Sequence, residues 1–209
     1  RVLGGGIVQG SVILIGGEPG IGKSTLLLQT ASNIAENEKV YYFTGEESLE
    51  QIKLRADRLA LEYKDFLISS ESNCDNIINT LLDDNPSLAI IDSIQTIYSP
   101  SANSIAGSPA QIKNCAWALM QTAKLKNITI FLVGHITKEG TIAGPKILEH
   151  IVDCVLYFEG DDKGIYRILR AVKNRYGAID EVGIFEMAEK GLTEVKDPSM
   201  VFTRGINEP

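Results

Sequence analysis

Apolar runs of strand length alternate with stretches of helical spacing along the first 135 residues. Buried strands are predicted for the runs at 11–16, 40–44, 66–69, 88–92 and 129–135. Between these runs apolar residues recur at intervals of three and four, which predicts helices over 24–36, 49–59, 75–82 and 111–126. Ser48, with Gln51 three residues later, is a typical start signal for the second helix. The alternation predicts an α/β fold with a mostly parallel central sheet flanked by helices.

The pattern changes in the last third of the chain. The runs at 155–159, 166–174 and 182–187 resemble strands separated by polar turns, which predicts antiparallel or mixed strands at the C-terminal edge of the sheet. Two irregular segments, 99–109 and 137–145, directly follow core strands. An α/β sheet places its ligand-facing loops there, although each segment could also be an ordinary surface connection.

Composition and charge narrow the classes of function. The 209 residues suit one domain, and 44% hydrophobic with 22% charged residues is typical of a chain that buries a core. The net charge of −7 argues against a protein that coats duplex DNA through bulk charge. No apolar run approaches the roughly 18 residues of a membrane span, so we expect no membrane partner.

The cysteines Cys74, Cys115 and Cys154 lie about forty residues apart. A zinc site or a disulfide framework needs closer pairs, so we expect buried reduced thiols, no bound zinc and a cytoplasmic location.

A phosphate-binding loop is the strongest motif. The string G-x-x-x-x-G-K-[S/T] is matched between a predicted strand and a predicted helix. The expected nucleotide-binding residues are Gly17, Glu18, Pro19, Gly20, Ile21, Gly22, Lys23, Ser24 and Thr25. In such a loop backbone N–H groups cradle phosphate oxygens, so Lys23 should reach the β- and γ-phosphates and Ser24 should ligate Mg²⁺. The predicted cofactors are therefore ATP or ADP and Mg²⁺.

Three further side chains at predicted strand ends fit ATP hydrolysis. Asp92 ends a buried strand in the manner of a Walker B carboxylate, which would bind Mg²⁺ with Ser24, although Asp-Ser can also simply cap a turn. Glu46 is the first candidate for the carboxylate that orients the attacking water, and Glu47 is the second. His135 ends the strand at 129–135 and could sense the γ-phosphate, although a lone histidine is more often a structural group.

These motifs resemble the RecA-like P-loop NTPase core of the bacterial RadA/Sms DNA repair proteins. The resemblance runs from Arg1 to about Met200. Besides the phosphate loop, it is carried by Arg-Val-Leu-Gly-Gly-Gly at 1–6, Gly-Glu-Glu-Ser at 45–48, Ile-Asp-Ser-Ile-Gln-Thr at 91–96, Gly-His-Ile-Thr-Lys-Glu-Gly at 134–140 and Lys-Asn-Arg-Tyr-Gly at 173–177. The last has Tyr176 where Phe is commoner in the family.

The resemblance implies a homohexameric ring that hydrolyses ATP and translocates on single-stranded or branched DNA during recombination and branch migration, with a recombinase as a possible partner. It implies that Lys173 and Arg175 reach into the nucleotide site of a neighbouring subunit, although their spacing alone suits an ordinary charged hairpin. DNA contact would fall to the two irregular segments, with Lys138 and Lys146 as the DNA-binding cations of the second.

The family pattern also has parts that these residues do not contain. We expect one RecA-like domain over 1–209, with a core to about residue 200 and a tail or linker over 201–209. The family's zinc module and its domain resembling the Lon protease fold are not among these residues. A KaiC-like scaffold or signalling ATPase remains an alternative, and a small-molecule kinase ranks last because Arg55, Arg58 and the other arginines form no lid-like cluster.

Overall fold

The computed structural model describes residues 1–61, 66–102, 104–135, 145–161 and 164–196. The helices of this part are α1 (Lys23–Ala35), α2 (Leu49–Arg58), α3 (Cys74–Asp84), α4 (Pro109–Lys126) and α5 (Pro145–Leu148). The strands are β1 (Val12–Gly17), β2 (Val40–Thr44), β3 (Phe66–Ser69), β4 (Leu88–Asp92), β5 (Thr129–His135), β6 (Cys154–Gly160), β7 (Tyr166–Asn174), β8 (Val182–Ala188) and β9 (Gly191–Glu194).

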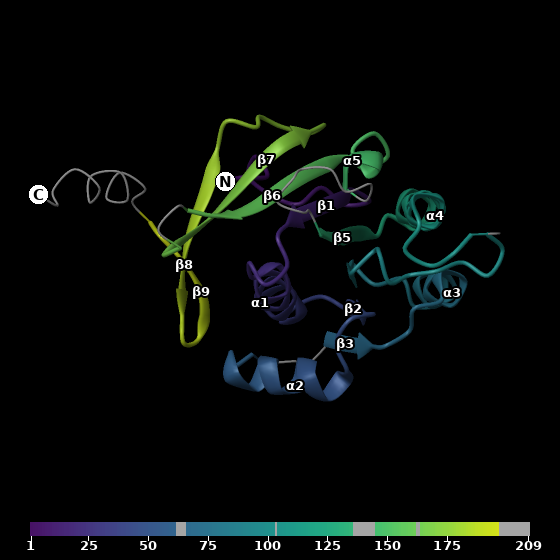
Figure 1. Ribbon diagram of the computed structural model, residues 1–209, viewed down its shortest axis with the longest axis horizontal. Coiled ribbons are helices and arrows are strands. Elements are labelled where there is room, and N and C mark those ends of the chain that lie inside the picture. The colour runs from purple at the N-terminus through teal and green to yellow at the C-terminus, as the bar shows by residue number, and fades with distance from the viewer. Residues whose placement is uncertain (62–65, 103, 136–144, 162–163, 197–209) are drawn as a thin grey trace, which may run out of the picture.

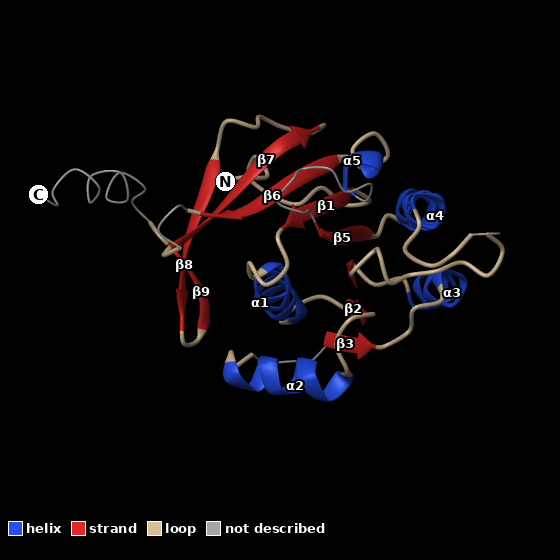
Figure 2. Cartoon of the chain, viewed as in Figure 1, coloured by secondary structure: helices blue, strands red, loops and turns tan. Residues whose placement is uncertain are grey.

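All of these strands belong to one sheet in the order β3-β2-β4-β5-β1-β6-β7-β8-β9. The pairs from β3 to β6 are parallel, and those from β6 to β9 are antiparallel. Figure 1 shows α1 and α2 on one side of the parallel strands and α3 and α4 on the other. In Figure 2 the helices gather around the parallel strands, whereas β7, β8 and β9 extend beyond them. The predicted fold, including its antiparallel C-terminal edge, is confirmed.

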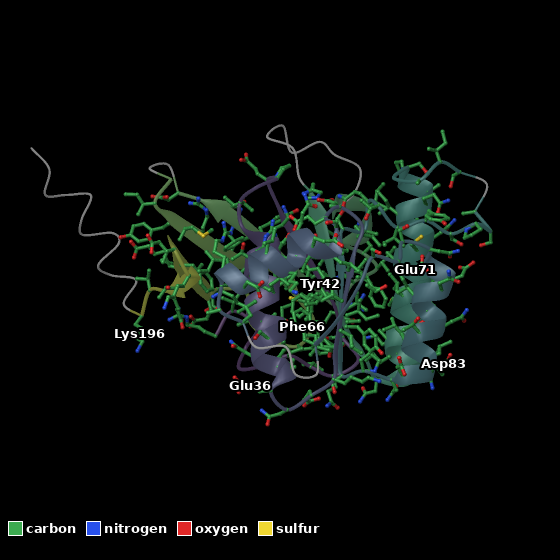
Figure 3. The ribbon with its side chains drawn as sticks, turned by 90° about the horizontal axis from the view of Figure 1, so that it is seen from below. Glu36, Tyr42, Phe66, Glu71, Asp83 and Lys196 are labelled. Carbon is green, nitrogen blue, oxygen red and sulfur yellow. The ribbon has the colours of Figure 1, made fainter. Side chains whose placement is uncertain are left out.

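Two hydrophobic layers hold the sheet between the helices. Successive residues of the central strands alternate between the layers: Val12 and Leu14 pack on the side of α3 and α4, and Ile13 and Ile15 on the side of α1 and α2. Because both faces are covered, β1, β2 and β4 are buried along their whole length. Figure 3 shows Tyr42 and Phe66 in the interior, and the charged Glu36, Glu71, Asp83 and Lys196 toward the periphery.

The predicted element boundaries differ from the observed ones by at most two residues. The helix predicted to begin at 111 begins at Pro109, because the Ser108 side chain caps its first turn and Pro suits the first helical position. The capping box of Ser48 and Gln51 is present as predicted. Two short elements, α5 and β9, were not predicted, because their four residues show neither a continuous apolar run nor a helical or alternating pattern.

The first irregular segment is held in place by one side chain. Gln111 is buried, and its amide nitrogen donates to the carbonyl oxygens of Ser99, Ala102 and Ser104, while its oxygen accepts from the Ser99 N–H. Ile105 in this segment is 84% exposed. The second irregular segment, 137–145, lies outside the described residues except for Pro145, which begins α5.

The three cysteines are free and buried, which agrees with the predicted thiols. Within the described residues no helix is both long and apolar enough to span a membrane.

A buried carboxylate ties the amino ends of the parallel strands together. Asp153, whose side chain is 2% exposed, accepts hydrogen bonds from the Val12 N–H at 2.9 Å, Lys124 Nζ at 2.6 Å and Arg175 Nη1 at 3.1 Å. Burial raises the pKa of Asp153, but these hydrogen bonds and the Lys124 charge outweigh burial and leave the pKa below its usual value. The charge of Asp153 therefore stabilises the fold.

We expect Asp153→Asn to lower the free energy of unfolding at pH 7 by about 3 kcal/mol, because it removes the charge of a buried pair. That corresponds to a melting temperature about 10 °C lower. Since the folded pKa lies below the unfolded value of about 3.9, this contribution is present above pH 4 and lost as the pH falls through the folded pKa. The difference in melting temperature between parent and variant should therefore narrow as the pH falls from 7 to 3.

Glu159→Gln is the matched control, because Glu159 pairs with Arg170 on the surface with both side chains nearly half exposed. It should change the free energy of unfolding by no more than about 0.5 kcal/mol. A pH-independent gap between Asp153→Asn and the parent would contradict the electrostatic assignment.

Candidate functional site

The carboxyl ends of the parallel strands bring distant residues to one edge of the sheet. Gly17 at the end of β1 pairs with His135 at the end of β5, and Thr44 at the end of β2 pairs with Asp92 at the end of β4. A cavity of about 880 Å³ opens at this edge. It is lined by Pro19, Gly20, Gly22, Lys23, Ser24, Thr25, Glu46, Glu47, Arg55, Arg58, Leu59, His135 and the turn at 187–191. The structure thus places eight of the predicted site residues around one cavity, namely Pro19, Gly20, Gly22, Lys23, Ser24, Thr25, Glu46 and His135.

The phosphate-loop residues connect β1 to the first turn of α1. Gly20 and Gly22 have φ angles of +78° and +113°, which turn successive backbone N–H groups as a phosphate cradle requires. At Gly17 a Cβ atom would lie 2.3 Å from the carbonyl oxygen of Phe158, so only glycine fits there. The Ile21 carbonyl accepts a hydrogen bond from Arg167 Nε at 3.2 Å. Sequence analysis gave no signal for Arg167, which comes from β7.

Lys23 is a buried cation whose side chain turns back over its own loop. Its Nζ donates to the carbonyl oxygens of Gly17 at 2.8 Å and Glu18 at 2.9 Å, and lies 3.3 Å from His135 Nδ1. Burial lowers the pKa of Lys23, while the negative charges of Asp92 and Glu46 raise it. The pKa of Lys23 is lowered overall, so desolvation of the ammonium group outweighs its attraction to the two carboxylates.

Glu46 and His135 meet directly. His135 Nε2 lies 2.6 Å from Glu46 Oε1, and Ser93 Oγ donates to the same oxygen at 2.5 Å. Because His135 Nδ1 faces the donor Lys23, the arrangement suits a neutral ring that carries its proton on Nε2 and donates it to Glu46. The hydrogen bond from His135 is the main cause that lowers the pKa of Glu46, and burial opposes it.

Glu47, the second candidate for the water-orienting carboxylate, lies differently. Its carboxylate pairs with Arg55 of α2, and its backbone N–H and carbonyl bond the hydroxyl of Thr44. Arg55 therefore neutralises Glu47 at the wall of the cavity. Of the two glutamates, Glu46 is the one in contact with His135.

Asp92, Tyr42 and Ser24 form an oxygen-rich group beneath the phosphate loop. Asp92 is buried and accepts a hydrogen bond from the Tyr42 hydroxyl, which also interacts with the Ser24 side chain. Burial, followed by the charge of Asp92, raises the pKa of Tyr42, so this phenol stays neutral. The peptide bond between Asp92 and Ser93 is cis.

The donor set of this group fits magnesium, which prefers carboxylate and hydroxyl oxygens completed by phosphates and water. No cluster of three or more His, Cys, Asp or Glu side chains in the described parts of the chain is placed to hold a metal by itself. Tyr42 was not predicted, although a hydroxyl in a strand next to that of Asp92 was a usable signal.

Lys173 and Arg175 lie at the amino ends of the parallel strands, whereas the cavity opens at their carboxyl ends. Lys173 Nζ donates to the carbonyl oxygens of Glu149 and Val152, and Arg175 pairs with Asp153 beside the first residue of β6. Burial, and then the charge of Arg175, lowers the pKa of Lys173. Within one chain these two cations do not meet the phosphate loop. Lys138 lies outside the described residues, and Lys146 belongs to α5.

Residues 1–141 match the family described as AAA domain. A DNA repair protein RadA of Bacillus subtilis (strain 168) is 54% identical over 203 residues, which are 97% of this chain and 44% of that protein. RadA of Streptococcus pyogenes serotype M1 is 55% identical over 202 residues, which are 97% of this chain and 45% of that protein. The chain thus spans less than half the length of these curated relatives.

Among solved structures, a KaiC-like protein of Pyrococcus horikoshii OT3 superposes with a TM-score of 0.74 at 19% identity, covering 91% of this chain and 92% of the other. At that identity the likeness shows a shared fold.

The hydrogen bond between His135 and Glu46 can be tested by measuring the pKa of Glu46 in variants. In the nucleotide-free protein, His135→Ala should raise the pKa of Glu46, because the strongest interaction favouring the carboxylate is lost. Ser93→Ala should raise it less, since the hydrogen bond from Ser93 is the weaker influence. Carboxyl ¹³C chemical shifts followed from pH 7 to pH 2.5 measure the change. His150→Ala removes the other histidine, which is exposed, and should leave the titration unchanged. A Glu46 pKa that stays constant or falls in His135→Ala contradicts the prediction.

Proposed function

We propose that this chain, which belongs to the RadA family of AAA-domain proteins, is the ATP-hydrolysing core of a DNA repair protein that moves along single-stranded or branched DNA. The observation that carries the proposal is the line of contacts from Lys23 through His135 to Glu46 at the mouth of the phosphate loop. These contacts support the proposal, because a γ-phosphate bound at the loop would lie beside a cation, an imidazole N–H and a carboxylate that can act as a base.

The phosphate loop would bind the nucleotide through its turned backbone N–H groups and through the partial positive charge at the start of α1. Lys23 would exchange the carbonyl oxygens of Gly17 and Glu18 for phosphate oxygens. Ser24 and Asp92 would hold Mg²⁺, which when bound neutralises charge on the β- and γ-phosphates. Tyr42 would keep the Asp92 carboxylate oriented toward that position.

Glu46 would take the proton of the attacking water at its carboxylate. In the free protein the carboxylate is occupied by His135 and Ser93, and its pKa is lowered. If His135 turns its Nε2–H toward the γ-phosphate, Glu46 loses that hydrogen bond and becomes a stronger base. The γ-phosphate would thereby switch on the base that hydrolyses it.

DNA contact is proposed for the segments that follow β4 and β5. Lys138 comes three residues after His135 in sequence, so a movement of His135 has a short path to a cation that can meet a DNA phosphate. Lys146 would add a second cation. The segment that Gln111 holds would offer backbone N–H groups and serine hydroxyls.

A head-to-tail ring of six subunits accounts for Lys173 and Arg175. In a heterologous interface one edge of a subunit meets the opposite edge of the next. These cations lie at the edge away from their own cavity, so in a ring they could stabilise the transferring phosphoryl group of a neighbour. A recombinase remains a possible further partner.

The roles of Lys23 and Glu46 are separable. Lys23→Ala should lose nucleotide binding and turnover together, whereas Glu46→Gln should keep ADP binding and lose turnover by about 100-fold or more. Calorimetric binding of ADP and steady-state release of phosphate give the two quantities. Glu50→Gln, at an exposed position of α2, should resemble the parent in both. Full turnover in Glu46→Gln, with loss in Glu47→Gln, would move the base to Glu47.

Coupling to DNA tests the motor. ATP hydrolysis by the parent should rise on addition of an unstructured oligodeoxythymidine, with a half-saturating DNA concentration that increases steeply with salt. Lys138→Ala should reduce the slope of log affinity against log salt by about one unit. Lys53→Ala, an exposed lysine on α2 and on the other side of the sheet from α4 (Figure 1), should leave the slope unchanged. Hydrolysis that requires Lys23 yet ignores DNA would instead favour the nucleotide-controlled scaffold.

A further inference from the structure

We infer that Gln29 is a positioning residue of the nucleotide site, because it holds the turn between β8 and β9 as a wall against which the nucleoside half of the nucleotide packs. The inference rests on the proposed function. It concerns the part of the cavity that the phosphate-loop motif does not specify.

The cavity has two chemically different halves. The half formed by the phosphate loop, Lys23, Glu46 and His135 presents N–H groups and charges. The other half lies between the end of α2 and the β8–β9 turn, and it is lined by Arg58, Leu59, Met187, Ala188, Glu189, Lys190 and Gly191. The carbon surface of Leu59, Met187 and Ala188 suits the faces of a planar heterocycle, and the charged side chains beside it suit ribose and base edges.

The β8–β9 turn is attached to α1 by one amide side chain. Gln29 Oε1 accepts from the Leu192 N–H at 2.9 Å, and Gln29 Nε2 donates to the Leu192 carbonyl at 3.2 Å. Within the described sheet, β9 is an edge strand with β8 as its neighbour. Gln29 therefore bonds the open edge of β9 as a further strand would. Figure 1 shows the hairpin running alongside α1 toward α2.

This attachment joins the wall to the phosphate loop itself. Gln29 lies six residues after Lys23 on the same helix, so the turn is fixed to the element that begins at the loop. Met187 of the wall also packs directly against the phosphate loop, since its Cε lies only 3.1 Å from where a Cβ atom on Gly22 would be. The two halves of the cavity are thus held in a fixed relation.

Gly191 shows how closely the wall is seated. Its φ of +103° disfavours other residues, and a Cβ atom there would lie 2.7 Å from Leu59 Cδ2 and 2.8 Å from Gln29 Oε1. A side chain at 191 must therefore displace the side chains of Leu59 and Gln29 or move the turn away from them. Gly191 thus gives a second, independent way to displace the wall.

The test compares a ligand that has a nucleoside with one that lacks it. The affinities of ADP and of inorganic tripolyphosphate, both with Mg²⁺, are measured by calorimetry for the parent, Gln29→Ala and Gln29→Glu. Gln29→Ala should lower the affinity for ADP about tenfold, because two hydrogen bonds that hold the wall are lost. It should change the affinity for tripolyphosphate by less than about twofold. Gln29→Glu keeps the acceptor for the Leu192 N–H but turns a carboxylate oxygen toward the Leu192 carbonyl, so it too should weaken ADP binding selectively. Asn33→Ala, on the exposed face of the same helix, should change neither affinity.

Gly191→Ala should reproduce the selective loss of ADP affinity. Its matched control is Gly164→Ala, because Gly164 also has a positive φ, of +72°, yet no atom lies within 4 Å of the Cβ position. The two variants share the backbone strain and differ in the steric clash, so only Gly191→Ala should weaken ADP.

Equal losses for ADP and tripolyphosphate in Gln29→Ala, Gln29→Glu and Gly191→Ala would overturn the inference and leave Gln29 a purely structural residue. Unchanged ADP affinity in these variants would also overturn it. If Gln29→Ala does not fold, Gln29→Glu and Gly191→Ala decide. Failure of the parent to bind either ligand would instead contradict the proposed function, so the two failures are distinguishable.

Discussion

The parallel pairing of β1, β2, β4 and β5 is the constraint on which the site depends. Parallel strands end at one edge, so Gly17, His135, Thr44 and Asp92 become neighbours although they come from four separate parts of the chain. Parallel pairing also requires crossover helices, which cover both faces and explain the fully buried strands. The apolar strands thus build the fold, and the polar residues that directly follow them build the site.

Lys23 introduces a second constraint, because an ammonium group is buried among carbonyl oxygens. Burial lowers its pKa, and the nearby charges of Asp92 and Glu46 only partly restore it. Phosphate oxygens would supply the negative charge that this environment lacks. His135 contacts both the ammonium group and one of these carboxylates, since Nδ1 faces Lys23 and Nε2 faces Glu46. In the proposed mechanism, a ligand that attracts Lys23 would therefore also disturb the hydrogen bond that lowers the pKa of Glu46.

The sequence was sufficient where the signal is local. Strand-length apolar runs, the Ser48 capping box and the phosphate loop each lie within a few consecutive residues, and each is found where it was predicted. The choice between Glu46 and Glu47 was not local, because both follow the same strand. Only the pairing of Glu47 with Arg55 and the meeting of Glu46 with His135 separate their surroundings. Arg167 gave no signal, because it contacts Ile21 across 146 residues.

The two halves of the cavity also differ in how close together their residues lie in the sequence. The phosphate half consists largely of consecutive residues from 17 to 25, whose geometry follows from glycines and a helix start. The other half forms only when α2, α1 and the β8–β9 turn meet, through a side chain that bonds β9 across 163 residues. Loosening of the tertiary packing should therefore disturb the second half before the first. A chain in that state would still hold phosphates through local structure, yet it would lose the contacts by which it distinguishes a nucleotide from any other polyphosphate.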